Sequence, residues 1–329
     1  MRAIQITEET GPDSALKLVE LPEPEASHML TPGSGVLVEV HVAGVSFPEL
    51  LQTRGEYQMK PPLPYVPGSE VGGVVISAPD GAAVKAGDRV AAFCALGGWA
   101  ETAVAPEFFT FPLGDLDYAQ GAALVLNYHT AYFSLRVRGR LKEGETVLVH
   151  GGAGGVGTAS LQVARALGAK TIATVSTEEK RTVAEQAGAD HVVMIAEGWK
   201  DEVVEISGGG VDMVLDPVGG DRFLDSLRSL AEDGRLVVVG FTGGSIPEVR
   251  VNRLLLKNTE VIGAGWGAYA MGKPELTREI GAAIGRMIDA GIVAPLIGQR
   301  FGMEDAAAAL HTLDERRALG KVVLDVRPA

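Results

Sequence analysis

The chain has 329 residues, of which 46% are hydrophobic and 22% are charged, and this composition is typical of a folded protein. Its formal net charge of −13 argues against nucleic acid or an anionic membrane as the main partner. The single cysteine, Cys94, excludes an intrachain disulfide and a thiolate-rich metal site. We expect two domains, no membrane span, no signal peptide and a reduced, cytoplasmic setting.

The first third of the chain predicts β structure. Residues 35–42 alternate apolar and polar side chains, which is typical of a half-buried strand. Residues 70–77 and 88–93 are further short strands, and turn sequences lie at residues 79–81 and 85–88. Many short strands separated by such turns favour a compact, barrel-like domain.

The pattern changes near residue 118. Residues 118–135 predict a helix, and after them strands alternate with helices, including those at residues 156–167 and 178–186. This alternation predicts a parallel sheet wound on both faces. Beyond residue 292 the chain returns to short strands and ends in one at residues 321–326, and we expect this tail to rejoin the first domain. The predicted strands of the sheet are residues 146–150, 171–175, 191–194, 211–216, 235–240 and 260–263.

A glycine-rich turn joins the first of these strands to its helix and fits G-x-G-x-x-G. In this pattern the first glycine permits a tight turn, the second lets the backbone approach a pyrophosphate, and the third lets helix and strand pack closely. The N-terminus of the following helix then favours a phosphate. The alternative is a glycine-rich turn without a ligand. The motif consists of Gly152, Ala153, Gly154, Gly155, Val156 and Gly157.

The end of the next strand indicates which dinucleotide binds. NAD sites usually carry Asp or Glu there, whereas this chain has Ser176 and Thr177, followed by Lys180 and Arg181. The hydroxyls and the two basic side chains suit a ribose 2′-phosphate, so we expect NADPH as the cofactor. In a second interpretation Ser176 and Glu179 form a capping box and the basic residues are only solvated. The two interpretations are compatible.

The motifs, taken in order, resemble one enzyme superfamily. They are GVSFPELLQTRGEYQMKPPLPYVPGSEVGGVV, GDRV, HGGAGGVG, STEEKR, GADHVV, LDPVGG and GKVVL. They are similar to those of medium-chain dehydrogenase/reductases, in the zinc-free quinone oxidoreductase branch, over nearly the full chain. The resemblance implies an α/β plus β fold in which a GroES-like β-barrel catalytic domain, residues 1–123 completed by residues 293–329, accompanies a Rossmann NADP-binding domain at residues 124–292. It also implies an active-site cleft between them and a homodimer formed by pairing of residues 260–264.

The resemblance also bears on metal. Zinc alcohol dehydrogenases of this superfamily have a cysteine and a histidine where this chain has Ser46 and Ser69. Zinc requires thiolate, imidazole or carboxylate ligands, so we expect a metal-free enzyme. Without a metal, hydride is best accepted by a molecule that delocalises the developing charge itself, such as a quinone or an α,β-unsaturated carbonyl.

Several residues are candidates for this site by resemblance. The Tyr57 phenol is expected either to donate to a carbonyl oxygen or only to pack, and Glu70 is expected to be a structural acid. His129 is expected to be a structural partner. Ser46 and Asn127 join Tyr57 as candidate catalytic residues. The candidate cofactor contacts outside the glycine motif and the strand end are Thr130, Gly240, Phe241, Thr242, Gly265, Trp266 and Lys321.

The function that follows is NADPH-dependent hydride transfer to a small-molecule quinone or enone. A 2-enoyl thioester reductase uses the same hydride chemistry on a longer substrate and is the second enzyme hypothesis. A non-catalytic NADPH-binding redox sensor is the hypothesis from another class. Turnover separates them, because a sensor binds NADPH without oxidising it.

Overall fold

The computed structural model describes residues 1–327, and the chain divides into two compact units. Unit 1 consists of Met1–Leu126, Lys273–Gly281 and the chain from Pro295 on, and unit 2 consists of Asn127–Gly272 and Ala282–Ala294. The sequence places the domain boundaries after residues 123 and 292, and it assigns residues 273–281 to the second domain, whereas their contacts assign them to unit 1.

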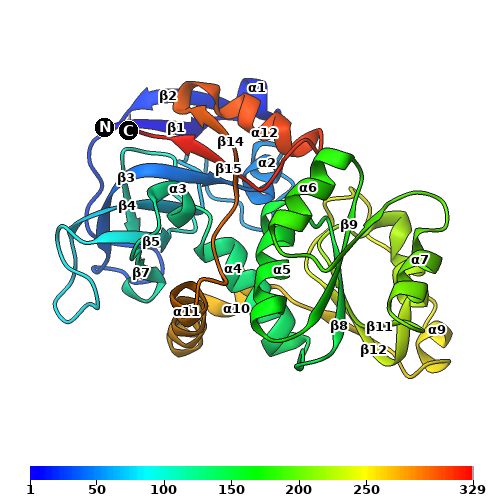
Figure 1. Cartoon of the computed structure of the whole chain (residues 1–329). Helices are drawn as coiled ribbons and strands as arrows, with labels where there is room; N and C mark the ends of the chain where they lie inside the picture. The colour runs from blue at the N-terminus through cyan, green and yellow to red at the C-terminus, as the bar shows by residue number, and fades with distance from the viewer. Residues whose placement is uncertain (328–329) are drawn as a thin grey trace. The chain divides into compact units, whose positions relative to one another are not determined.

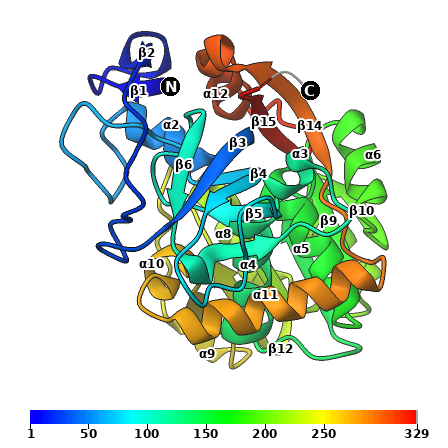
Figure 2. The ribbon, with the colours of Figure 1, turned by 90° about the vertical axis from the view of Figure 1, so that its left-hand side faces the viewer.

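Unit 1 is built on a seven-stranded sheet of order β14-β15-β3-β4-β5-β7, with β6 also paired to β3. All pairings in it are antiparallel except that of β14 with β15. The C-terminal strand β15 pairs with β3, so segments from both ends of the chain share one sheet (Figure 2). A separate two-stranded sheet joins β1 to β2. The strands are β1 (Arg2–Ile6), β2 (Leu16–Glu20), β3 (Val36–Val45), β4 (Glu70–Ser77), β5 (Arg89–Phe93), β6 (Thr102–Ala105), β7 (Thr110–Pro112), β14 (Ile297–Gly302) and β15 (Lys321–Asp325).

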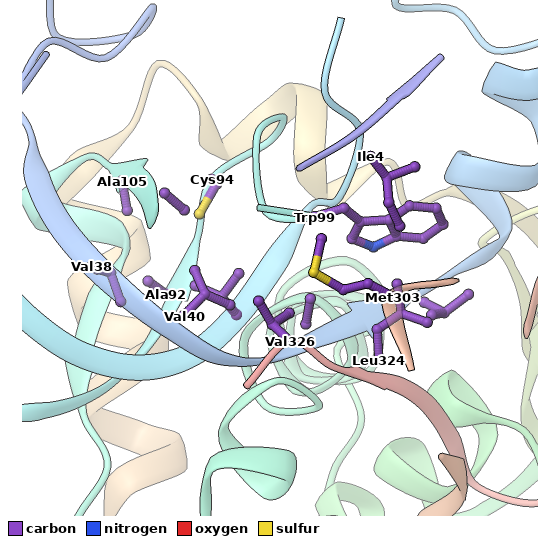
Figure 3. Close-up of a cluster of buried hydrophobic side chains, with 14 of the residues drawn as sticks. Ile4, Val38, Val40, Ala92, Cys94, Trp99, Ala105, Met303, Leu324 and Val326 are labelled. Atoms are coloured by element: carbon purple, nitrogen blue, oxygen red, sulfur yellow. The ribbon is translucent and has the colours of Figure 1, made fainter. Parts of the chain in front are cut away.

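The core of unit 1 lies on the inner face of this sheet (Figure 3). Alternate residues of β3, such as Val38 and Val40, are fully buried, as the alternating pattern of the sequence predicts. Trp99 is also fully buried, and its indole N–H donates to the Gly44 carbonyl at 2.9 Å. This bond satisfies the one polar group that the indole brings into the core.

Short helices complete unit 1: α1 (Pro12–Ala15), α2 (Phe47–Thr53), α3 (Tyr118–Gly121), α12 (Ala306–Asp314) and the 3₁₀ turns η1 (Glu107–Phe109) and η4 (Met303–Asp305). Helix α11 (Pro274–Asp289) contributes its first half. Helix α12 corrects the expectation of only short strands in the tail. It contains four consecutive alanines, which are strong helix formers, and it buries Ala309 and Leu310.

Unit 2 is built on a six-stranded parallel sheet of order β10-β9-β8-β11-β12-β13, which confirms the predicted doubly wound fold. Strand β12 begins and ends earlier than residues 235–240. Its register shifts against β11, and Asp233 has a left-handed φ of 57°, so the first part of the strand is irregular. The strands are β8 (Thr146–His150), β9 (Lys170–Val175), β10 (His191–Met194), β11 (Val211–Asp216), β12 (Leu230–Val238) and β13 (Glu260–Gly263).

Helices cover both faces of this sheet. Helices α5 and α6 contact each other and strands β8 to β10, and α7 lies on the other face (Figure 1). Helix α7 contacts β10 and α8, and α8 contacts β12. The single helix expected over residues 118–135 is instead α3, α4 and a π-helical segment, η2. The helical segments of unit 2 are α4 (Val125–Tyr132), η2 (Phe133–Arg138), α5 (Gly155–Ala166), α6 (Glu178–Gln186), α7 (Trp199–Ile206), η3 (Gly220–Arg222), α8 (Phe223–Arg228), α9 (Asn252–Leu255) and α10 (Trp266–Ala270). None of the helices among residues 1–327 has both the length and the apolarity needed to cross a bilayer.

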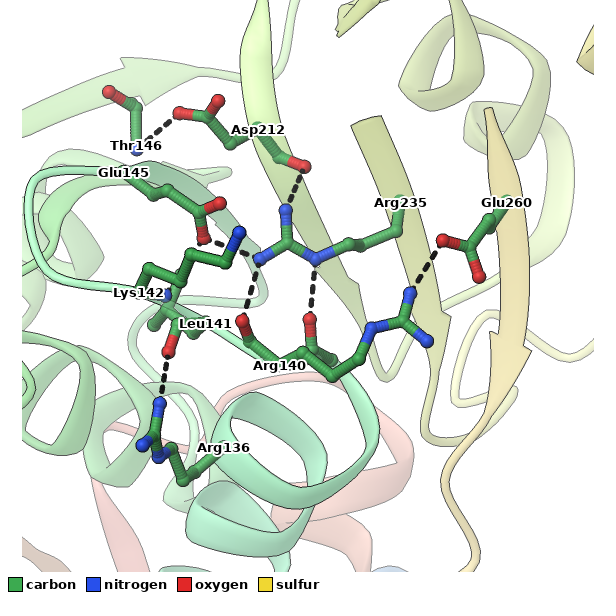
Figure 4. Close-up of polar contacts among 10 residues, drawn as sticks. Arg136, Arg140, Leu141, Lys142, Glu145, Thr146, Asp212, Arg235 and Glu260 are labelled. Atoms are coloured by element: carbon green, nitrogen blue, oxygen red, sulfur yellow. Dashed lines mark hydrogen bonds and ion pairs between the residues drawn. The ribbon is translucent and has the colours of Figure 1, made fainter. Parts of the chain in front are cut away.

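A buried arginine fixes the loop that enters this sheet. Arg235 of β12 is 7% exposed and donates to the carbonyls of Gly139, Asp212 and Arg140 (Figure 4). It also forms an ion pair with Glu145. A guanidinium carries five N–H donors in a rigid plane, so one side chain can satisfy several acceptors at once. These contacts hold the start of β8, and therefore the glycine motif that follows it, in a fixed position.

Candidate active site

The glycine corner lies in unit 2, between the end of β8 and the start of α5. Gly154 is the residue before α5 and has a φ of −85° and a ψ of 175°. The turn that leads to it is made by Gly151, whose φ of 62° lies in the left-handed region. The tight turn therefore falls at Gly151, one residue before the Gly152 that the motif indicates.

The glycines of the motif differ in what would meet a side chain. A Cβ at Gly152 would lie 2.7 Å from the Cβ of Ala173, and one at Gly157 would lie 2.1 Å from the carbonyl oxygen of Gly151. Packing within unit 2 therefore requires both glycines. A Cβ at Gly154 would meet nothing closer than the Gly151 oxygen at 3.6 Å. Gly154 thus leaves open the space before a helix N-terminus, where backbone N–H groups and the helix dipole favour a phosphate.

The residues at the tip of β9 carry hydroxyls and a cation. Ser176 and Thr177 follow the strand directly and are exposed. The ammonium of Lys180 donates to the Ser176 hydroxyl at 3.1 Å. An NAD-binding chain of this fold has a carboxylate at this position. The strand tip therefore offers donors to an anionic group.

The capping-box interpretation of this helix is wrong by one residue. The residue before α6 is Thr177, and its hydroxyl accepts a hydrogen bond from the backbone N–H of Lys180 at 3.3 Å. Glu179 interacts with its own backbone N–H and with the Thr177 hydroxyl, and both contacts lower the pKa of its carboxyl group. Capping by Thr177 leaves the Ser176 hydroxyl next to the Lys180 ammonium, outside the helix.

Arg181 points away from the strand tip. Its Nε donates to the Glu178 carboxylate at 3.0 Å, and its Nη1 donates to the Val192 carbonyl at 2.8 Å. Both contacts hold the guanidinium beside β10. Its expected contact with the cofactor stays a prediction, and it would require these bonds to be exchanged.

Two loops meet at the carboxyl edge of the sheet, where ligands bind in folds of this kind. After β11, the carboxylate of Asp216 accepts from the backbone N–H of Val218 at 2.9 Å. After β12, the Thr242 hydroxyl donates to the Pro217 carbonyl at 3.1 Å, which joins the second loop to the first. Phe241 lies in this second loop and is 37% exposed. The predicted contacts of residues 240–242 with a cofactor stay predictions.

Helix α4 carries three of the expected site residues. The side chain of Asn127 packs on Gly155. Thr130, three residues further along the helix, is buried. His129 is buried and packs edge-on against Trp266, with ring centroids 5.4 Å apart. Burial lowers the pKa of His129 to about 3, so this imidazole is neutral at pH 7, as suits a structural partner. Trp266 itself is 1% exposed, which leaves little of its ring to wall a nicotinamide.

In unit 1 a buried lysine connects two candidate residues. The Lys321 ammonium donates to the Glu70 carboxylate and to the Ser46 hydroxyl, both at 2.6 Å. The other Glu70 oxygen accepts from the backbone N–H of Leu126 at 2.8 Å. Glu70 is fully buried, which raises the pKa of its carboxyl group, and the charge of Lys321 opposes that shift. The predicted contact of Lys321 with the cofactor stays a prediction. The side chain is 4% exposed, so little of it is accessible to a ligand.

A second buried acid, Glu49 of α2, lies beside this group. Its carboxylate accepts from the Ser69 hydroxyl at 2.5 Å and from the backbone N–H groups of Ser69 and Ser46, both at 2.9 Å. Full burial raises the pKa of Glu49, and the hydrogen bond from Ser69 and the charge of Lys321 oppose that shift. Burial and the negative charge of Glu49 together raise the pKa of Tyr57, a partly exposed phenol.

Glu49 is not among the site residues that the sequence predicts. A signal was present, because Ser46 and Glu49 have the S-x-x-E spacing of a capping box and Pro48 lies in the first helical turn. That pattern predicts the start of α2 and the contact of Glu49 with the Ser46 backbone. It carries no information about Ser69, which reaches Glu49 from a different part of unit 1.

A surface hollow of about 630 Å³ in unit 2 contains none of the predicted site residues. It is lined in part by Arg136, Leu141 and Lys142, which precede β8, and by Leu167 after α5. It therefore lies at the edge of the sheet where the strands begin, opposite the glycine corner.

Comparison with known proteins assigns the family. Residues 32–115 match the alcohol dehydrogenase GroES-like domain, and residues 155–281 match the zinc-binding dehydrogenase domain. Quinone oxidoreductase-like protein 2 of Bos taurus is 38% identical over 298 residues, covering 89% of this chain and 85% of its own. Quinone oxidoreductase of Rattus norvegicus is 37% identical over 333 residues, covering 98% of this chain and 97% of its own. The chain belongs to the quinone oxidoreductase branch of the medium-chain dehydrogenase/reductase superfamily. It is an oxidoreductase.

A solved structure supports the same assignment. A mycobacterial protein complexed with NADPH has a TM-score of 0.89 and 34% identity, and the match covers 99% of this chain and 100% of that one. Unit 1 is thus the GroES-like domain of the superfamily and unit 2 its Rossmann domain.

The description of one matching domain as zinc-binding raises the question of a zinc ion. At the two positions where zinc enzymes of the superfamily carry ligands, this chain has neutral hydroxyls, and these are already bonded to the Lys321 ammonium and to Glu49. Zinc prefers thiolate, imidazole or carboxylate, and an ammonium repels it. Residues 1–327 contain no group of three or more His, Cys, Asp or Glu that could hold a metal ion. These residues do not fit a zinc ion.

Proposed function

We propose that this protein is an NADPH-dependent reductase of quinones or α,β-unsaturated carbonyls that works without a metal. The observation that carries the proposal is the pair of serines, Ser46 and Ser69, bonded into a buried network where zinc ligands would stand. A reductase without a Lewis acid works best with an acceptor that spreads negative charge over its own π system. Quinones and enones are such acceptors, whereas an isolated ketone is not.

The residues of unit 2 fit NADPH. The open space at Gly154 suits the pyrophosphate, and Ser176 with Lys180 suits the 2′-phosphate. When bound, this cofactor supplies the hydride that reduces the acceptor. The mycobacterial relative complexed with NADPH supports NADPH, which carries this 2′-phosphate, rather than NADH as the cofactor. Thr130 and the loops after β12 and β13 are the further candidates for holding the nicotinamide half.

Tyr57 is the candidate donor to the acceptor oxygen from unit 1. Its phenol is protonated at neutral pH, as is usual for tyrosine, and burial and the nearby Glu49 raise its pKa further. A hydrogen bond to the oxygen strengthens as negative charge develops there, and such a bond lowers the barrier. The ring also shapes the pocket, and the two roles are separable by removing the hydroxyl alone.

The test is NADPH oxidation by the full chain offered quinones, enones, simple ketones and enoyl thioesters in parallel. Turnover with the first two classes, in the presence of a chelator, and none with isolated ketones would support the proposal. Preferred turnover of enoyl thioesters would replace it with an enoyl thioester reductase. NADPH binding without oxidation by any acceptor would contradict both and favour a redox sensor.

We also propose that the protein is a homodimer that pairs through β13. This strand is at the edge of the sheet, and within the described residues its one neighbour is β12. The aliphatic residues Val251, Leu255 and Leu256, which precede it, are 75–76% exposed. An open strand edge beside exposed aliphatic residues favours association with a second copy.

Light scattering should give a dimer mass at micromolar concentration, and Leu255→Glu with Leu256→Glu should shift it towards the monomer. A monomeric wild type would contradict the proposal.

A further inference from the structure

The Lys321 ammonium and the Ser46 hydroxyl form a hydrogen-bonded pair with one buried member and one partly exposed member. The charged end is buried, since Lys321 is 4% exposed and its partner Glu70 is 0% exposed. Ser46 is partly exposed. Its hydroxyl oxygen accepts a hydrogen bond from Lys321 at 2.6 Å, so its own proton is available for donation to another acceptor. The positive charge is therefore buried, and the hydroxyl is the group of the pair that a ligand can reach.

We propose that this pair is an oxyanion-binding site, in which Ser46 donates to an enolate or phenolate oxygen and Lys321 polarises Ser46. The inference rests on the proposed function, because it names the group that receives the acceptor oxygen. Ser46 is the catalytic residue of the pair. Lys321 acts through it and is a positioning residue.

The order of charges supports this assignment. An oxygen bound to the Ser46 hydroxyl is one hydrogen bond away from the ammonium and two from the Glu70 carboxylate. Attraction to the nearer positive charge therefore exceeds repulsion from the Glu70 carboxylate beyond it. Glu49, which accepts from the Ser46 backbone N–H, adds a second repulsion that the ammonium must also offset. Glu70 in turn makes the burial of an ammonium tolerable, because an unpaired charge in this position would be strongly destabilising. Glu70 is itself held by the Leu126 backbone N–H, which fixes the whole row.

Structural roles account for only part of this arrangement. The ion pair between Lys321 and Glu70 joins β15 to β4, and it would do so without Ser46. The start of α2 is stabilised by a reciprocal capping box, in which the Ser46 side chain accepts from the Glu49 backbone N–H and the Ser46 backbone N–H donates to the Glu49 carboxylate at 2.9 Å. Neither of these bonds involves Lys321. The contact between ammonium and hydroxyl serves neither purpose, yet it is as short as the ion pair itself.

The proton balance is closed by water. Hydride addition at the β-carbon of an enone moves the π electrons to the carbonyl oxygen, and addition to a quinone gives the hydroquinone monoanion. The Ser46 hydrogen bond holds that oxyanion, which then takes its proton from water, so Ser46 and Lys321 keep their own protons. The net change is one hydride and one proton added to the acceptor.

The test uses a probe that is not reduced. We expect 4-nitrophenol to bind the full-length protein with an increased fraction of phenolate, measured by its absorbance at a pH where the free probe is half ionised. Ser46→Ala should weaken phenolate binding tenfold or more, and Ser46→Thr should restore much of it. Binding of 4-nitroanisole, which has no ionisable oxygen, should be the same in all three proteins.

Lys321 is tested in the same assay. Lys321→Met should lose the phenolate preference, and Lys321→Arg should keep part of it because the charge remains. If Lys321→Met does not fold, the double variant Lys321→Met with Glu70→Gln removes both buried charges and takes its place. Failure of the wild type to favour phenolate over phenol, or equal phenolate binding by wild type and Ser46→Ala, would overturn the inference. Because the probe needs no turnover, a protein that reduces no quinone or enone contradicts the proposed function alone.

Discussion

Replacing Gly154 by alanine should separate cofactor binding from folding. The backbone there has a φ of −85° and a ψ of 175°, which alanine adopts without strain. The added Cβ meets its nearest neighbour, the Gly151 oxygen, at 3.6 Å, which is ordinary contact. Alanine is a poorer residue than glycine before a helix, but it also restricts the unfolded chain. Each effect is on the order of 0.5–1 kcal/mol, and they oppose each other. We therefore expect a change of less than about 1 kcal/mol in the free energy of unfolding.

NADPH should respond much more strongly. The new methyl group fills the space in which we place the pyrophosphate and keeps it from the backbone N–H groups at the start of α5. Losing one charge-assisted hydrogen bond costs about 1.5–3 kcal/mol. This corresponds to a Kd increase of roughly 10- to 150-fold. The measurements are calorimetric or fluorescence titration with NADPH and a thermal melt of the free protein.

Gly157→Ala is the matched control, since its Cβ would lie 2.1 Å from the Gly151 carbonyl oxygen. It should lower Tm in the absence of cofactor, which Gly154→Ala should not. A Gly154→Ala protein that folds normally and binds NADPH within about threefold of the wild type would refute the placement of the pyrophosphate.

Further outcomes follow from other parts of the structure. Lys180→Ala should weaken NADPH roughly 10- to 100-fold and NADH little, because it removes one contact to the 2′-phosphate; equal losses for both cofactors would contradict that role. Tyr57→Phe should lower kcat and kcat/KM together at unchanged NADPH affinity. Wild-type turnover by that variant, with a raised KM for Tyr57→Ala, would leave the ring a packing role only. Exhaustive chelation should leave activity intact, and stoichiometric zinc whose removal abolishes activity would refute metal independence. The pKa values of His129 and His150 are lowered by burial to about 3 and about 4. Their stabilising contribution is thus present above pH 6.5, the ordinary value, and is lost as pH falls towards these values. Their imidazole NMR signals should stay those of the neutral ring down to about pH 5, and titration of either near pH 6 would be the contrary result.

The sequence by itself determined the features that depend on neighbouring residues. Alternation of strands and helices predicts the parallel sheet of unit 2, and G-x-G-x-x-G after a strand predicts the start of α5. Residue composition at the tip of β9 predicts the type of dinucleotide. These predictions rest on the spacing of hydrophobic residues and on backbone conformational preferences, both of which are set by residues close together in sequence. Local patterns were less accurate for helix ends. The cap of α6 is Thr177 rather than Ser176, since neighbouring hydroxyl residues offer nearly equivalent caps. The helix expected over residues 118–135 is divided into three segments.

Only the tertiary structure decided the buried network of unit 1. Ser46 and Lys321 are 275 residues apart in sequence, and Lys321 and Glu70 are 251 apart. Pairing of β15 with β3 and of β3 with β4 brings the three residues together. No periodicity of the chain encodes which ammonium will meet which carboxylate. The cost of burying a charge requires that each have a partner, but the partner is chosen by strand register across the sheet.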